Sequence, residues 1–109
     1  MSVSRAFALF LEQAPDHAAA WMKAAEGLAE ASALDSKTAA LAYLAVLAAT
    51  GRHSGIPFHV AEAKRAGATR EEIVSAILLG LPAVGNLAIG ALPEALAAYD
   101  AQPQEPASD

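Results

Sequence analysis

The chain has no cysteine among its 109 residues. This absence excludes disulfide bonds, thiolate-bound metals and any cysteine nucleophile. Positive charge is also scarce, since seven Lys and Arg stand against twelve Asp and Glu and the formal net charge is −5. Because so few basic residues cannot form a stripe that neutralises phosphates, we expect no nucleic-acid partner.

Long hydrophobic runs are missing as well. The longest, residues 39–49, is interrupted only by the hydroxyl of Tyr43 and is far shorter than the roughly 18 residues that would span a bilayer. The first residues, MSVSRAFALFLEQ, hold a short apolar patch followed by Glu12, with no small-residue cleavage site. We therefore expect a cytoplasmic protein without a membrane segment.

What the chain does have is alanine and other apolar residues. Its hydrophobic content is 55% and its mean hydropathy is +0.33. Alanine is the strongest helix former, so the composition predicts an all-α, single-domain helical bundle over residues 1–100. A polar, proline-bearing tail, 101–109, is expected to be disordered. Because so small a core cannot hide this many apolar residues, we also expect a homo-oligomer.

Capping signals and hydrophobic spacing predict about six helices. Ser4 is a plausible N-cap for the first, Asp35 or Ser36 for the third and Ser54 for the fourth. Thr69 and Glu72 form a capping box for the fifth. Gly51 and Gly67 are expected helix stops. The predicted helices cover residues 5–13, 15–33, 36–49, 55–66 and 70–79, and residues 83–99 are expected to hold two short ones.

The same spacing predicts buried faces. Residues 39–49 are apolar on every side, which favours a central helix that is buried all round, either in the middle of an oligomer or between its own neighbours. In the second helix the predicted buried stripe is Ala18, Trp21, Met22, Ala25 and Leu28, with Trp21 as a core or interface anchor. In the fifth helix it is Ile73, Ala76 and Ile77, continued by Leu81. In the fourth, His59 shares an inner face with Ile56, Ala63 and Ala66.

His59 is the first candidate catalytic residue, because an inward-facing imidazole can act as a general acid or base. The alternative is a structural histidine that is hydrogen-bonded to a carbonyl or to Tyr43. His53, in the turn 51–55, is the second candidate catalytic residue, and the alternative for it is a solvated loop residue. No third His, Asp or Glu lies at ligand spacing, so no metal is expected.

Arg52, Ser54 and Tyr43 are the candidate substrate-binding residues. Arg52 is the one cation in the turn, and together with the amides that begin the next helix it could bind a carboxylate. The alternative for Arg52 is a helix C-cap whose charge stabilises the end of the third helix. No phosphate-binding loop motif is present, and we expect no cofactor.

Residues 34–80 carry a longer pattern. It reads L-D-x-K-T, an apolar helix, a glycine turn, H-V-x-x-A-x-x-A-G-A-T-R-E-E-I and then A-I-L. This pattern resembles the carboxymuconolactone decarboxylase and alkylhydroperoxidase D-like family. The resemblance implies an all-helical protomer in a trimer or hexamer, with the site near a subunit interface. It also implies peroxiredoxin-like activity, by homology alone.

The redox-active branch of that family has two cysteines, seven and four residues before the motif histidine, and a glutamate twelve residues before the first cysteine. The matching positions here are Arg52, Gly55 and Ala40, so only His59 remains. We therefore expect no thiol peroxidase activity, because Arg and Gly can neither attack a peroxide nor resolve a sulfenate. Cysteine-free members exist, the lactone decarboxylases among them.

Two functional hypotheses follow. In the first, the chain is an acid–base enzyme for a small carboxylated or lactone substrate, with His59 as proton shuttle and Arg52 or His53 as the anion partner. In the second, it is a catalytically silent helical oligomer that binds a ligand or partner, and His59 is structural.

Overall fold

Every regular element in the computed structural model, which describes residues 4–101, is a helix, as predicted. Two of the helices, α6 (Leu81–Val84) and α7 (Asn86–Ile89), are single turns, and η1 (His53–Gly55) is one turn of 3-10 helix. Six described helices have nine residues or more: α1 (Arg5–Gln13), α2 (Pro15–Ala31), α3 (Ser36–Ala49), α4 (Ile56–Arg65), α5 (Arg70–Leu78) and α8 (Leu92–Ala101).

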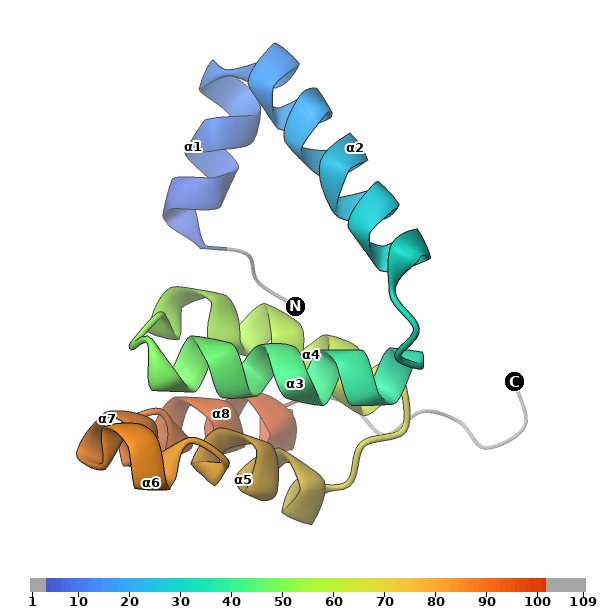
Figure 1. Ribbon diagram of the computed structural model, residues 1–109. Helices are drawn as coiled ribbons and strands as arrows, with labels where there is room; N and C mark the ends of the chain where they lie inside the picture. The colour runs from blue at the N-terminus through green and yellow to red at the C-terminus, as the bar shows by residue number, and fades with distance from the viewer. Residues whose placement is uncertain (1–3, 102–109) are drawn as a thin grey trace.

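The helices from α3 onward form a two-layered bundle. Figure 1 shows α3 and α4, in green, side by side above α5–α8, in yellow to red. The helix α3 packs on α4 and α5, and α8 packs on α4 and α5. The core lies between the layers and is made of small and branched side chains, which allow close helix contacts. The buried core residues are Leu44, Ala48, Ile56, Val60, Ala63, Ala68, Ile73, Ala76, Ile77, Ala91 and Ala95.

Local capping signals explain where the helices begin. The Ser4 hydroxyl accepts the Phe7 amide at 3.1 Å, and an Asp35 carboxylate oxygen accepts the Thr38 amide at 2.7 Å. At α5 the predicted capping box is confirmed: the Thr69 hydroxyl accepts the Glu72 amide at 3.1 Å, and the Glu72 carboxylate accepts the Thr69 amide at 2.9 Å.

Two glycines explain where α3 and α4 end. Gly51 has φ +71° and Gly67 has φ +103°, conformations that side chains with a Cβ rarely adopt. After α3, the Arg52 amide donates to the Leu47 carbonyl at 2.9 Å. After α4, the Ala68 amide donates to the Ala63 carbonyl at 2.9 Å. Both are Schellman endings, as the glycine positions predicted.

Polar contacts fasten α8 across the bundle. The Tyr99 hydroxyl donates to the Ala68 carbonyl at 3.1 Å, and Lys64 Nζ donates to the Tyr99 carbonyl at 3.0 Å. The Arg70 guanidinium binds both carboxylate oxygens of Asp100, at 2.9 and 3.1 Å. The helix continues to Ala101, and the remainder of the predicted tail, 102–109, lies outside the described residues.

The helices α1 and α2 form a hairpin, here called the arm, that stands apart from the bundle (Figure 1). Their main packing is on each other. The predicted buried stripe of α2 is therefore wrong in the single chain: Ala18 is buried, whereas Trp21, Met22, Ala25 and Leu28 are exposed.

Further predictions differ from the single chain. The chain's own neighbours do not cover α3 on all sides, since Leu44 and Ala48 are buried but Tyr43 and Val46 are about half exposed. Burial of α3 within an oligomer, the other predicted possibility, stays a prediction. Leu81 is exposed as well, because α5 ends at Leu78 and the chain turns before it. The segment after α5 divides into three helices where two were expected.

Candidate functional site

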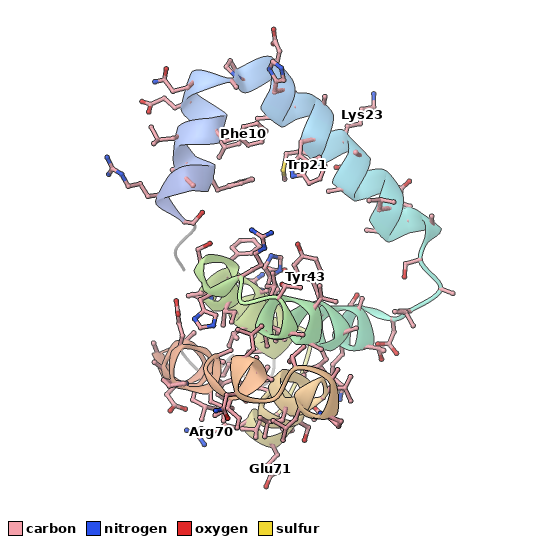
Figure 2. The ribbon with its side chains drawn as sticks, turned by 60° about the vertical axis from the view of Figure 1, so that its left-hand side comes forward. Phe10, Trp21, Lys23, Tyr43, Arg70 and Glu71 are labelled. Atoms are coloured by element: carbon pink, nitrogen blue, oxygen red, sulfur yellow. The ribbon has the colours of Figure 1, made fainter. Side chains whose placement is uncertain are left out.

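His59 lies on α4 at the side of the bundle that faces the arm. Its ring centroid is 4.4 Å from that of Tyr43 on α3 and 5.1 Å from that of Phe58, which meets it edge-on. Figure 2 shows Tyr43 at this upper side. The predicted inner face is half right, because Ile56 and Ala63 are fully buried while His59 is partly exposed.

The turn before α4 lies against His59. A Cβ built on Gly55 would be 3.7 Å from His59 Cδ2 and 3.5 Å from Leu47 Cδ1, which are ordinary contact distances. Ser54 does not cap α4, contrary to the prediction: Gly55 is the N-cap, and the Ile56 amide donates to the His53 carbonyl. A backbone carbonyl of the 3-10 turn thus accepts the hydrogen bond that the Ser54 hydroxyl was expected to accept at the start of α4.

The surroundings of His59 favour its neutral form. Burial lowers the pKa of His59 below its ordinary value, and the negative charge of Glu62 opposes this only in part. Neither ring nitrogen forms a hydrogen bond with any residue of the described range 4–101. The contact with Tyr43 is ring packing, so the imidazole nitrogens are available to a ligand.

A shallow groove of about 280 Å³ runs between α3 and α4 on the side of Glu62. Ala40 and Glu62 line it, and they lie one helical turn from Tyr43 and His59 respectively, which are not part of its lining. Glu62 is paired there with Arg65. A second depression, of about 410 Å³, lies on the outer side of α5, where Figure 2 shows Arg70 and Glu71.

His53 points elsewhere. Its Nδ1 is 3.9 Å from a carboxylate oxygen of Glu94, and its Cε1 lies 3.9 Å from a Cβ built on Gly90. The structure therefore brings His59 and Tyr43 together but directs His53 towards α7 and α8. Arg52 and Ser54 are exposed on the turn, and Arg52 also provides the backbone amide that closes α3.

Within residues 4–101 no group of three His, Asp or Glu side chains is placed to hold a metal ion. No helix in that range is long and apolar enough to cross a membrane.

Sequence reasoning missed three neighbours of the candidate residues. Glu62 follows His59 by three positions on the same helix, so its influence could have been inferred from spacing. Phe58 is adjacent in sequence and gives no such signal. Glu94 meets His53 only because α8 folds back on the turn, which no local pattern indicates.

The model of the carboxymuconolactone decarboxylase family matches residues 15–101 of this chain, from the start of α2 to the end of α8. Searches of the curated proteins and of the solved structures gave no significant match.

The lowered pKa of His59 predicts a pH-dependent stability. The unfolded chain binds a proton with a pKa near 6.5, whereas the folded chain binds it only at lower pH. The free energy of unfolding should therefore fall as the pH drops from about 6.5 through the lowered folded pKa, and this contribution should be constant above that window. Urea unfolding at one protein concentration, between about pH 5 and pH 7.5, measures it.

His59→Gln should remove this part of the pH dependence. His17→Gln, on the exposed side of the arm, is the matched control and should keep it. If the free energy of unfolding depends on pH equally in the native chain and in His59→Gln, the folded state does not disfavour the charged ring.

Proposed function

Because the chain belongs to the carboxymuconolactone decarboxylase family, we propose that it is an acid–base enzyme for a small carboxylated or lactone substrate. His59 is the group that carries the proton. Thiol chemistry is closed to this chain, which has no cysteine. The proposed reaction class is proton transfer at a carbon next to a carboxylate or lactone carbonyl, which needs a base that can also return the proton.

The observation that carries this proposal is the state of the His59 ring. It is half-buried, its pKa is lowered by that burial, and its nitrogens form no hydrogen bond within residues 4–101. A neutral imidazole of this kind accepts a proton near neutral pH and donates it again once charged. Tyr43, in contact with the ring, is the proposed wall of the substrate site.

Arg52 is the proposed anion partner, because it is an exposed cation on the turn whose last residue, Gly55, lies beside His59. Ser54, exposed on the same turn, is proposed as a hydroxyl donor to the substrate. His53 is the weaker of the two candidate anion partners, since its ring lies towards Glu94, whose carboxylate repels an anion.

A catalytically silent homo-oligomer that binds a ligand or a partner is the second candidate. One observation favours it: His59 packs against two rings, but no carboxylate or carbonyl within residues 4–101 is hydrogen-bonded to it and fixes its tautomer. In many acid–base sites a third group does so. Under either function we propose a trimer or hexamer, as the resemblance implies, in the cytoplasm.

Titration of His59 by NMR, with acetate or succinate added, tests the enzymatic proposal. A bound carboxylate stabilises the charged imidazole, so the pKa of His59 should rise and the rise should saturate with ligand. Acetamide, and chloride at equal ionic strength, should not cause it. Arg52→Gln should abolish the rise, whereas Arg5→Gln, on the exposed surface of α1, should preserve it.

A His59 pKa that no carboxylate changes would contradict the enzymatic proposal and favour the silent oligomer.

The thiol chemistry is missing because of the residues at a few positions only, and we propose that the backbone at these positions can accept cysteines. Gly55 has φ −87°, which any residue adopts, and a Cβ there meets only ordinary contacts, including His59 Cδ2 at 3.7 Å. Arg52 follows the Schellman ending of α3 and leaves its side chain exposed. Ala40 is partly buried against the core and also lines the groove between α3 and α4, which is the side on which a longer side chain would have to lie.

We therefore expect the native chain to consume no peroxide with a dithiol reductant, and the triple variant Arg52→Cys, Gly55→Cys, Ala40→Glu to consume it. One thiolate would attack a peroxide oxygen, break the O–O bond, become a sulfenic acid and release water or the alcohol. The second thiol would displace water from the sulfenic acid and form a disulfide, and the dithiol reductant, itself oxidised to a disulfide, would restore both thiols. Arg52→Ser, Gly55→Ser, Ala40→Glu is the matched control and should be inactive. Turnover by the native chain would refute this account, and a folded triple variant without a disulfide would show that the turn is misaligned with the redox motif.

A further inference from the structure

The inner side of the arm is an apolar surface that the single chain leaves open. On α2, Trp21 is 59% exposed, Met22 48% and Leu28 71%. Figure 2 shows Trp21 on the side of α2 that faces the bundle and Lys23 on the side that faces away. The charged residues of α2 are thus segregated from a continuous apolar stripe, as in a helix that packs against a partner.

A second open apolar surface lies opposite, on α3. No charged residue occurs between positions 39 and 49, and Tyr43 and Val46 on the outer side are 49% and 56% exposed. Figure 2 shows Tyr43 directed towards the arm from below. The arm surface and the α3 surface face each other, yet no extensive packing joins either arm helix to the bundle.

The connection from Ser32 to Asp35 joins the arm to α3. The Ser32 hydroxyl accepts the Leu34 amide at 3.1 Å, and Asp35 caps α3 through the Thr38 amide. Both hydrogen bonds are local to this connection. The helix α2 has 17 residues and is about 25 Å long. The apolar stripe therefore lies further from the bundle towards the start of α2 than at its end, as Figure 1 shows.

The exposed area is a large part of one partner's share of a stable interface. An aromatic side chain carries roughly 150–250 Å². The five half-exposed apolar side chains of the two surfaces, at roughly 100 Å² each, therefore offer about 500 Å², against the ~800 Å² that each partner contributes to a standard interface. Neither surface carries a charge that calls for an oppositely charged partner. Both surfaces are open in every copy, so a second copy offers the apolar counterpart that each surface lacks.

We propose that the arm of a second copy occupies the space between arm and bundle, so that its Trp21 packs against Tyr43 beside His59, and that the exchange is reciprocal. This inference rests on the homo-oligomer proposed above and specifies which surfaces form it. The half-exposed His59 ring then becomes enclosed, and the partner's indole forms one wall of the proposed substrate site. Reciprocal exchange joins copies in pairs, so it favours a hexamer of three pairs over a trimer.

Because the native chain has no cysteine, single cysteines give an unambiguous test. Trp21→Cys and Tyr43→Cys proteins, mixed and oxidised mildly, should form a disulfide-linked species of two chains that reductant removes. Lys23→Cys mixed with Tyr43→Cys is the matched control and should form no such link, since Lys23 lies on the far side of α2. The yield is read on non-reducing gels against each single variant alone.

An internally bridged single chain in the double variant Trp21→Cys, Tyr43→Cys, with no link in the mixture, would show that the arm closes on its own bundle and would overturn the proposal. No link in either sample would overturn it as well. An independent reading comes from the native protein, whose only tryptophan is Trp21. Its emission should be that of a buried indole and should shift to longer wavelength on dilution, whereas a water-exposed emission at every concentration would overturn the proposal.

The enzymatic proposal and the arm exchange can be contradicted independently of each other. A carboxylate titration that leaves His59 unchanged would end the enzymatic proposal without affecting the cross-link. An oligomer without the cross-link between positions 21 and 43 would preserve self-association and end the arm exchange.

Discussion

The helix α3 can bury only one of its sides within a single chain, and the rest of the structure depends on that limit. The helix packs on α4 beside it and on α5 below it, and contributes Leu44 and Ala48 to the core. Its upper side, equally uncharged, keeps Tyr43 and Val46 about half exposed. The candidate site at His59 lies at this upper side, so whatever covers α3 also decides how far the imidazole is removed from water.

The turn between α3 and α4 places the site. Gly51 takes a positive φ that ends α3, and the turn then brings Gly55 against His59 in an ordinary backbone conformation. The histidine packs on Tyr43 from the neighbouring helix in a chain that has no cysteine. The absence of cysteine excludes thiol chemistry, and His59 is held in its place without it, which is why an acid–base role for His59 is the economical proposal.

The sequence correctly predicted features that residues within about one helical turn of each other determine. The Thr69 capping box, the Asp35 cap and the Gly51 and Gly67 endings are all of this kind, and all are confirmed. Apolar periodicity identified the inner face of α2 but could not say whether the chain's own core or a partner covers it. Trp21, predicted as a core or interface anchor, is therefore not part of the single chain's core. The proximity of His53 to Glu94 depends on the path of α8, and no local pattern encodes it.

The central claim is that the apolar sides of α3 and of the arm are covered by further copies of the chain. Light scattering on the native protein at micromolar concentration tests it most directly. The account predicts a single species with six times the chain mass of 11.1 kDa. A trimer would contradict reciprocal pairing, and a stable monomer of 11.1 kDa would contradict the claim as a whole.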